Sequence, residues 1–340
     1  MRVFPVTTIS TIKNCLLHFI GQTPNQRWNR QLNKLVRGVD SNRRDKIRVL
    51  LDNYHTSAAL GHGDFRNEPK PDFDKTLITI QLEALNRMRS FDLVGFQPAR
   101  GPVCKVYNLQ WKSDNTDPDA MVLSVVDGIV RAERNPLEIQ WPIETVMDEL
   151  TKFGAEFVKE FEEASIDELA LECDRNVVSD IKTVATKLIS QKIGDWQTLV
   201  VTLYRMSNDI AQRSRRGSGN WAILPFDLVA MLQESPNYLH FPEENGSGLR
   251  LMGELLHSPD AEHGIKIYSD ILQDDNTILV GYKGISEIDA GYIYSPYIMT
   301  VPLGIQTDTA TFKPVQKFAN RSGAYMHNPE NYYTSIQVLG

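Results

Sequence analysis

The sequence is poor in cysteine and has no long apolar run. Its 340 residues include only three cysteines, Cys15, Cys104 and Cys173. An odd and widely spaced set forms neither a disulfide framework nor a metal knuckle, and such usage is typical of a reducing compartment. No apolar stretch approaches the roughly 18 residues that a membrane span needs, and Lys13 and Asn14 interrupt the N-terminal apolar segment. We therefore expect a soluble protein without a secretion signal.

Sequence signatures of enzymes are also missing. There is no Gly-x-Ser-x-Gly and no His-Glu-x-x-His motif. Two loose groups could ligate a metal, namely His257, Asp260, Glu262 and His263, and His55, His62 and Asp64. Their spacing fits no metal-site template, so solvated loops explain them better. The sequence predicts no active site, no bound metal and no cofactor, with a metal-dependent hydrolase using His257 and His263 as an alternative.

One basic turn could hold an anion. Residues 213–220 read Arg-Ser-Arg-Arg-Gly-Ser-Gly-Asn, and adjacent guanidinium groups and Gly-exposed amides bind oxyanions. The segment lacks the spacing of a phosphate-binding loop, and its Gly-x-Gly opens a predicted strand and not a helix. A basic helix end that turns into a strand is the favoured interpretation.

Charge is distributed unevenly along the chain. The net charge is −7, yet residues 1–50 carry +8, so the other 290 residues carry −15. Candidate basic residues for assembly or for facing DNA are Arg27, Arg30, Lys34, Arg37, Arg43, Arg44, Lys46 and Arg48. Candidate acidic partners are Glu160, Glu162, Glu163, Asp167 and Glu168. The basic segment could be a solvated face, a phosphate contact without sequence preference, or a docking element for the acidic region of another copy.

Apolar periodicity predicts several helices. A stripe at helical spacing follows Ser41 and ends at Gly61, and an earlier helix starts at Thr23-Pro24 and stops at Gly38. The spacing Ser165-x-x-Glu168 resembles a capping box and predicts the start of a long helix over 165–188. A shorter amphipathic helix over 150–161 precedes it, and two more are predicted over 196–213 and 227–233.

Strand signals alternate with these helices. Strands are predicted over 103–111 and 221–224, and a two-residue turn at Asp127-Gly128 predicts a hairpin of 121–126 with 129–133. Residues 278–297 form two strand-like runs around glycines and predict a second hairpin. The pattern alone predicts an α+β protein with more than one lobe.

Three separated motifs resemble one known family. Residues 280–284 read Val-Gly-Tyr-Lys-Gly, followed by Ile-Asp-Ala-Gly at 288–291, Tyr-Ser-Pro-Tyr at 294–297 and Pro-Leu at 302–303. Downstream come Phe-Lys-Pro-Val at 312–315, then Phe318, Arg321, Gly323 and Asn328-Pro329. Upstream lie the basic turn with Gly-Asn-Trp at 219–221, and Asp-Leu-Val-Gly-Phe-Gln-Pro at 92–98 before Gly101-Pro102. From about Leu77 to its end, the chain resembles the major capsid proteins of T-even-like tailed bacteriophages.

This resemblance implies an HK97-type capsid fold. The implied divisions are an N-terminal arm (1–75), the start of a peripheral domain (76–110), an extended loop (111–136), the peripheral domain with its spine helix (137–195), an axial domain (196–303) and a C-terminal return to the peripheral domain (304–340). In the resembled family, the extended loop lies over a neighbouring subunit.

The resemblance also implies a function and partners. We expect a major capsid protein without enzymatic activity or cofactor, which self-assembles as hexamers and possibly pentamers into an icosahedral shell around double-stranded DNA. Portal, scaffold and cement proteins are implied partners, with assembly in the host bacterial cytoplasm and no membrane. The implied intersubunit contacts favour docking of the basic arm on the acidic region. A pentameric vertex protein and a nucleic-acid-binding protein that uses the basic arm are the alternatives.

Overall fold

The computed structural model describes residues 33, 36–38, 41–60, 84–113, 121–140, 155–241, 248–257, 264–270, 275–307 and 314–339. The chain divides into two units, residues 1–44 and 45–340. The first unit includes the 3-10 helix η1 (Val36–Gly38), and α3 (Ser41–Leu60) begins within it. Both sheets and the helices after α3 lie in the second unit. In the described part of the chain, no helix is both long and apolar enough to cross a membrane.

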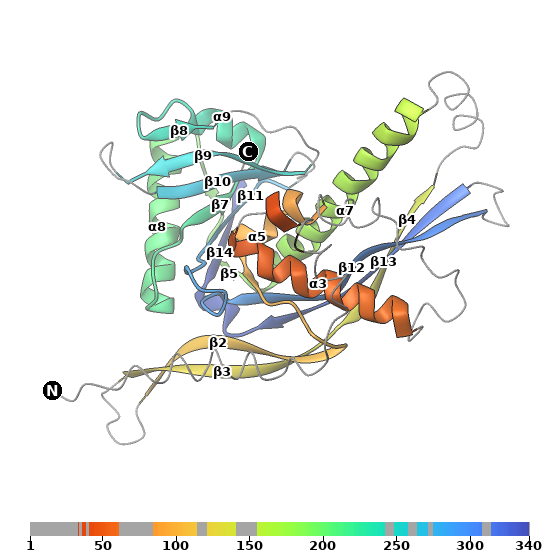
Figure 1. Cartoon of the computed structure of the whole chain (residues 1–340). Coiled ribbons are helices and arrows are strands. Elements are labelled where there is room, and N and C mark those ends of the chain that lie inside the picture. The colour runs from red at the N-terminus through yellow and green to blue at the C-terminus, as the bar shows by residue number, and fades with distance from the viewer. Residues whose placement is uncertain are drawn as a thin grey trace. The chain divides into compact units, whose positions relative to one another are not determined.

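One lobe is built on an eight-stranded sheet (Figure 1). Its strands are β5 (Thr186–Lys187), β6 (Gln191–Lys192), β7 (Trp221–Ile223), β8 (Tyr238–His240), β9 (Leu249–Leu256), β10 (Gly264–Asp270), β11 (Thr277–Gly281) and β14 (Tyr333–Leu339). The order is β5-β14-β11-β7-β10-β9-β8, and β6 also pairs with β14. The pairs β10–β7, β14–β5 and β14–β6 are parallel, whereas the other pairs are antiparallel.

Two helices complete this lobe. Helix α8 (Trp196–Ser214) begins at Asp195, whose side chain accepts a 2.6 Å hydrogen bond from the Thr198 backbone, as an N-cap should. Its apolar stripe, which includes Leu199, Leu203 and Ile210, joins α9 (Phe226–Leu232) and the sheet in one buried cluster. The predicted helices over 196–213 and 227–233 and the strand over 221–224 are confirmed to within one or two residues.

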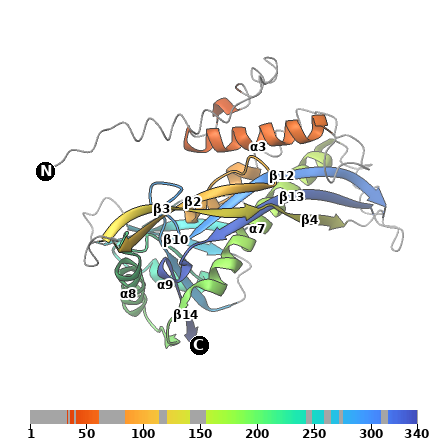
Figure 2. The same ribbon diagram turned by 90° about the horizontal axis from the view of Figure 1, so that it is seen from below.

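A second sheet has four strands. Their order is β1 (Gly95–Phe96), β12 (Tyr292–Thr307), β13 (Pro314–Met326) and β4 (Glu133–Gln140). The long strands β12, β13 and β4 pair antiparallel, and β1 pairs parallel with β12. The short helix α5 (Ser90–Leu93) leads into β1, and the 3-10 helix η2 (Pro329–Asn331) leads from β13 to β14. Figures 1 and 2 show the long helix α7 running between the two sheets.

Helix α7 (Ala155–Val184) is one continuous helix of 30 residues, so the predicted start at Ser165 is wrong. The Ser-x-x-Glu spacing lies inside it, and the described part of the predicted shorter helix before it merges into it. No glycine or proline occurs between Ala155 and Val184, and Gly154 precedes the first turn. Without a helix breaker, continuing the backbone hydrogen bonds costs less than ending one helix and nucleating another.

The prediction of a hairpin turn at Asp127-Gly128 is also wrong. Strand β3 (Met121–Arg131) passes straight through both residues and pairs along its whole length with β2 (Val103–Ser113), which confirms the strand predicted over 103–111. Glycine is required at position 128 for steric reasons and not for a turn, because a Cβ there would lie 2.2 Å from the ring of Tyr325. The two strands form a two-stranded ribbon, and the residues that join them lie outside the described chain.

The predicted hairpin over 278–297 is wrong in its pairing. Both runs are strands, but β11 lies in the eight-stranded sheet and β12 in the four-stranded sheet. Both edges of β11 are already occupied, by β7 and by β14, so β12 has no free edge there. Residues 282–291, here called the junction loop, therefore connect two sheets, and they are closed by an isolated bridge between Lys283 and Ala290.

Helix α3 is confirmed from Ser41 to Leu60, and Ile47, Leu50 and Leu51 of its predicted stripe are buried. Of the helix predicted from Thr23-Pro24 to Gly38, only residue 33 and η1 are described. Residues 84–87 are helical. The start of helix α5 is capped by a residue that is distant in sequence. The Asp174 carboxylate on α7 accepts hydrogen bonds from the backbone amides of Arg89 and Ser90 at 2.8 and 2.9 Å. This contact joins α5 to α7.

Candidate assembly surface and its anchoring loop

The ribbon has one packed face and one free face. Strand alternation places Val106 and Val130 on the packed face, where both are buried against Ile293 of β12 and Tyr325 of β13. Most of the side chains on the opposite face are large and apolar, and five of these are exposed. This free face of the ribbon consists of Val103, Tyr107, Leu123, Val125 and Ile129. An exposed Lys105–Asp127 ion pair of 3.0 Å lies among them.

Contiguous apolar exposure of this kind marks an interaction surface on a soluble protein. Single exposed apolar residues need no explanation, but here five occur on one face of one two-stranded element. The side chain of Ile129 is 69% exposed and that of Val103 57% exposed, so little of either is covered by the chain itself. The free face is therefore our candidate for the surface that another molecule covers.

The junction loop fixes the base of the ribbon. The Asn108 side chain is fully buried and donates to the Ala290 carbonyl at 2.5 Å, and the Leu109 amide donates to the Ile288 carbonyl at 2.8 Å. On the other side of the loop, Gln97 donates to the carbonyls of Tyr107 and Glu287, and the Tyr107 amide donates back to the Gln97 side chain. These hydrogen bonds fix the orientation of the ribbon relative to the junction loop.

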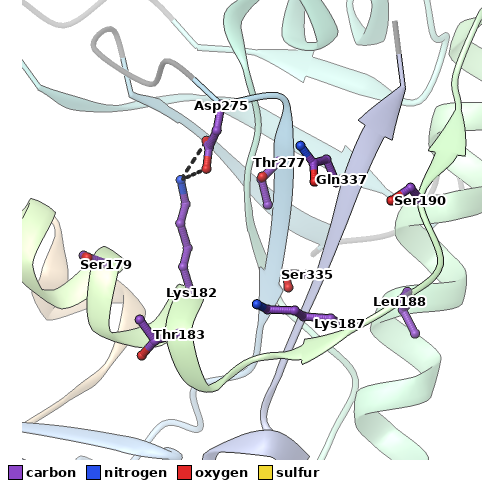
Figure 3. Close-up of a pocket in the computed structure, with 10 residues that line it drawn as sticks. All are labelled: Ser179, Lys182, Thr183, Lys187, Leu188, Ser190, Asp275, Thr277, Ser335 and Gln337. Carbon is purple, nitrogen blue, oxygen red and sulfur yellow. Dashed lines mark hydrogen bonds and ion pairs between the residues drawn. The ribbon is translucent and has the colours of Figure 1, made fainter.

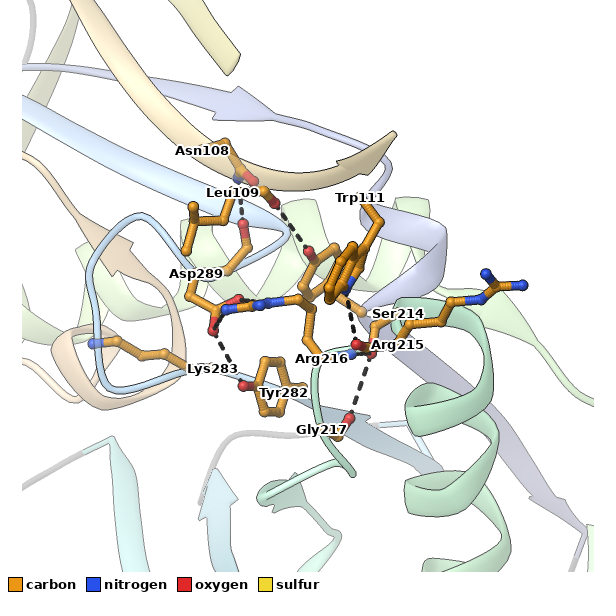
Figure 4. A network of polar contacts seen from close by, with 12 residues as sticks. Asn108, Leu109, Trp111, Ser214, Arg215, Arg216, Gly217, Tyr282, Lys283 and Asp289 are labelled. Carbon is orange, nitrogen blue, oxygen red and sulfur yellow. Dashed lines mark hydrogen bonds and ion pairs between the residues drawn. The ribbon is translucent and has the colours of Figure 1, made fainter. Parts of the chain in front are cut away.

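Asp289 holds the loop to the eight-stranded lobe (Figure 4). Arg216, just beyond the end of α8, donates to its two carboxylate oxygens at 2.9 and 2.7 Å, and the Tyr282 hydroxyl donates at 3.2 Å. The hydrogen bond to Asp289 raises the pKa of Arg216, and burial followed by the Asp289 charge raises the pKa of Tyr282 to about 12. Both donors keep their protons at neutral pH, so the contact persists there.

Glu287 holds the same loop to α3 and β1. Its carboxylate lies 2.5 Å from the Lys46 ammonium and 3.4 Å from that of Lys283, and it accepts a 2.7 Å hydrogen bond from the Phe96 amide. Lys283 also donates to the Phe91 carbonyl. Burial lowers the pKa of Lys283, which is opposed by the nearby Glu287 charge. Two basic groups and one amide therefore share a single carboxylate.

The basic turn after α8 is structural, as its favoured interpretation predicts. Arg213 donates to the Glu330 carbonyl and to the hydroxyls of Thr186 and Thr334, and Arg216 is paired with Asp289. Arg215 has the left-handed backbone conformation, φ 53°, that closes many helices. Its carbonyl accepts a 2.9 Å hydrogen bond from the Trp111 indole, which ties the far part of β2 to this turn (Figure 4).

The candidate charged residues are only partly described. Arg27, Arg30 and Lys34 lie outside the described residues, as do the side chains of Glu160, Glu162 and Glu163 on α7. Lys46 binds Glu287, and Asp167 pairs with Arg87. Arg37, Arg44 and Glu168 are exposed, whereas Arg43 and Arg48 are half-buried. Docking between copies through these residues stays a prediction.

Most of the candidate metal ligands lie outside the described residues. Of the predicted loop group, Asp260, Glu262 and His263 lie outside the described residues, and His257 is exposed beside the ring of Tyr204 at 5.2 Å. Of the second group, His62 and Asp64 lie outside the described residues, as does the side chain of His55. Among the residues that the structure describes, no group of three His, Cys, Asp or Glu side chains could hold a metal.

A polar hollow of about 390 Å³ lies beside the end of α7 (Figure 3). Its wall consists of Ser179, Lys182, Thr183, Lys187, Leu188, Ser190, Asp275, Thr277, Ser335 and Gln337. The only carboxylate in this lining, Asp275, accepts hydrogen bonds from Lys182 at 3.0 and 3.2 Å. That carboxylate is therefore engaged, and the lining contains no histidine or cysteine.

Comparison with known proteins decides the family. The model of the family described as "Major capsid protein Gp23" matches residues 112–338, about two-thirds of the chain. The chain belongs to this family. The match spans β3, α7, the eight-stranded sheet, the three long strands of the four-stranded sheet and the junction loop. Ribbon, long helix and α/β lobe follow one another in the predicted order, so the α+β, HK97-type capsid fold is confirmed.

Individual relatives are distant. The major capsid protein of Vibrio phage KVP40 is 23% identical over 242 residues, which cover 63% of this chain and 47% of the relative. That of Enterobacteria phage T4 is 24% identical over 225 residues, 57% of this chain and 42% of the relative. The chain spans about half the length of the curated relatives that it matches. Among solved structures, the capsid of cyanophage P-SCSP1u is 12% identical with a TM-score of 0.46, covering 83% of this chain and 94% of that one.

Proposed function

We propose that this chain is the structural subunit of the head shell of a tailed phage. Family membership supports a capsid role, and the free face of the ribbon is the single observation that carries the proposal. A subunit that worked as a monomer would leave five large apolar side chains exposed on one face. A shell subunit covers such a face with its neighbour. The chain acts by geometry and requires neither catalysis nor a cofactor.

The mechanism follows from how the ribbon is held. Its packed face and the junction loop fix its base, so the free face is presented in one orientation before a neighbour arrives. Preorganisation of this kind lowers the entropy cost of association. Each apolar side chain that a neighbour covers contributes on the order of 1 kcal/mol. Such modest contacts become sufficient because closed symmetry repeats them around every capsomer.

The finer partners form part of the same proposal. Hexamers and possibly pentamers of this chain would enclose double-stranded DNA in the virion, after assembly in the bacterial cytoplasm with scaffold, portal and cement proteins. The basic residues before position 50 would contact either the acidic half of α7 in another copy or the packaged DNA. What supports these assignments is the family and the opposite charges of the two segments.

Expression of the full chain tests the proposal. We expect large closed particles in negative-stain microscopy, and a sedimentation coefficient far above that of a 38.6 kDa monomer. A monomer that retards DNA in a gel would support the nucleic-acid-binding alternative and reject the shell. Labelling of a native phage head only at its vertices, by an antibody against this chain, would assign the chain to the pentameric vertex role.

A further inference from the structure

The tip of the junction loop exposes one apolar side chain completely. Residues 284–286 form this tip, and the side chain of Ile285 between Gly284 and Ser286 is 105% exposed, more than in an extended reference peptide. It therefore gains nothing from its own fold. An isoleucine is a costly choice for this position, because β-branched residues fit turns poorly and apolar surface in water is unfavourable.

The tip is held in one conformation. The Gly284 amide donates to the Asp289 carbonyl at 2.7 Å, and the Asp289 amide donates to the Ser286 carbonyl at 2.9 Å. A side chain at Gly284 would collide with Asp289, since a Cβ there would lie 2.2 Å from its carboxylate. Glycine thus permits a close approach that tightens the loop around Asp289.

The rest of the loop is anchored on several sides. Glu287, Ile288, Asp289 and Ala290 each make at least one contact with α3, β1, the ribbon or the turn after α8. Ile285 is the large side chain that these contacts leave free. A rigid support that presents one apolar group resembles an interface anchor, because the ordering cost is met during folding and not during binding.

We infer that Ile285 of one copy docks on the free face of the ribbon of a second copy. This inference rests on the proposed shell function. The free face holds five of the large apolar side chains that are exposed in the described chain, and the remaining ones are scattered singly or in pairs over other elements. A head-to-tail contact uses two different surfaces of each subunit and closes into rings. The tip and the free face are two such surfaces, one of each in every copy.

The first experiment replaces Ile285 in the full chain by Asp. Because the side chain contacts nothing in its own chain, Ile285→Asp should leave the thermal unfolding temperature unchanged. We expect at least a tenfold rise in the protein concentration needed for particle assembly, measured by sedimentation and light scattering, while Ile285→Leu assembles as wild type. Ile189→Asp is the matched control, since Ile189 is 92% exposed and lies between β5 and β6. It should assemble normally.

The outcomes separate this contact from the shell function itself. Wild-type assembly by Ile285→Asp would overturn the contact and leave the shell function standing. An equal loss from Ile189→Asp would also overturn it, because the effect would then follow from surface charge in general. Failure of the wild-type chain to form particles would reject the shell function and the contact together.

A second experiment tests the partner surface directly. Particles are assembled from a mixture of Ile285→Cys and Val125→Cys chains and are oxidised mildly. We expect a disulfide-linked dimer that contains one chain of each kind and that is absent from particles of either variant alone, which also controls for the native cysteines. Intact mixed particles without this dimer would overturn docking on the free face.

Discussion

Arg216 and Asp289 are 73 residues apart in sequence and form a two-bond ion pair in which both side chains are largely buried, 17% and 7% exposed. The pair joins the turn after α8 to the loop that connects the two sheets. The same loop fixes the base of the ribbon through Asn108 and Leu109. A single carboxylate therefore links the orientation of the ribbon to the eight-stranded lobe.

Removing one charge of this pair should destabilise the protein strongly. Asp289→Asn leaves the Arg216 guanidinium buried without its counter-charge, and it replaces one of the two oxygens that accept from Arg216 and Tyr282 by an amide NH2 group. Loss of one partner from a buried pair costs about 3 kcal/mol. Urea denaturation should show a lower midpoint by the corresponding amount. Asp127→Asn is the matched control, since its pair with Lys105 is exposed and should not matter measurably. Equal midpoints for both variants would contradict the structural role of Asp289.

A methyl group at Gly128 should displace the ribbon. Gly128→Ala places a Cβ 2.2 Å from the Tyr325 ring, and overpacking of this kind costs roughly 1–3 kcal/mol. The free energy of unfolding should fall accordingly, and hydrogen exchange should accelerate along β2 and β3. Gly194→Ala is the control, because no atom lies within 4 Å of the added methyl group.

A double variant tests whether the effect of Gly128→Ala comes from its contact with Tyr325 and not from the strand conformation of residue 128. Tyr325→Ala removes the ring that Gly128 faces, so the combined Gly128→Ala, Tyr325→Ala chain should lose less stability than the sum of the two single changes. Strict additivity would show that Gly128 matters for a reason other than its contact with Tyr325.

The sequence predicted correctly those helices and strands that are determined by residues close together in the sequence. The stripe of α8 follows a helical period and begins at a capping Asp195, so its neighbours in sequence suffice to define it. The same holds for α3 and β2. Predictions that used a local motif to end an element were wrong where a distant contact decides: Gly128 faces Tyr325, and both edges of β11 are taken by other strands.

The contact between Arg216 and Asp289 could not be predicted from the sequence. Arg216 and Asp289 each lie in a segment that carries the family resemblance, yet neither segment indicates the other as its partner. A basic turn can face solvent, DNA or its own fold, and only the packing of β7 beside β11 brings these two residues together. The one available signal was a glycine close to each charge, since Gly217 follows Arg216 directly and Gly291 lies two residues after Asp289, and glycines permit close backbone approach.

The free energy of unfolding should depend on the protonation of Asp174. Burial raises the pKa of this carboxyl to about 6, despite the two backbone hydrogen bonds that favour the charged form. The pKa of an unfolded Asp lies near ~3.9, so the folded state binds the proton more tightly. By linkage, this group makes the protein more stable as pH falls from about 6 to about 4, and it gives no further gain below that range.

Replacing the carboxyl by an amide measures this contribution. Asp174→Asn should lack the gain in stability between pH 7 and pH 4, which amounts to about 1.4 kcal/mol for each pH unit that separates the folded and unfolded pKa values. Urea denaturation of both proteins at pH 7 and pH 4 gives the two differences in unfolding free energy. Parallel changes in the two proteins would contradict the role of Asp174.

Loss of the Trp111 indole N–H should loosen the far part of the ribbon without unfolding the lobe. Trp111→Phe keeps an aromatic ring but removes the donor to the Arg215 carbonyl, a hydrogen bond of 2.9 Å. One such bond contributes about 1 kcal/mol. Hydrogen exchange should accelerate in β2 beyond Leu109 and in the paired start of β3, while exchange in α8 stays unchanged. Tyr107→Phe is the control, because the backbone of Tyr107 and not its hydroxyl group bonds to Gln97, and its ring remains on the free face.

If the ribbon must be preorganised to meet its neighbour, Trp111→Phe should also slow particle assembly in proportion to the added exchange, whereas a ribbon that folds only on contact would assemble at the wild-type rate.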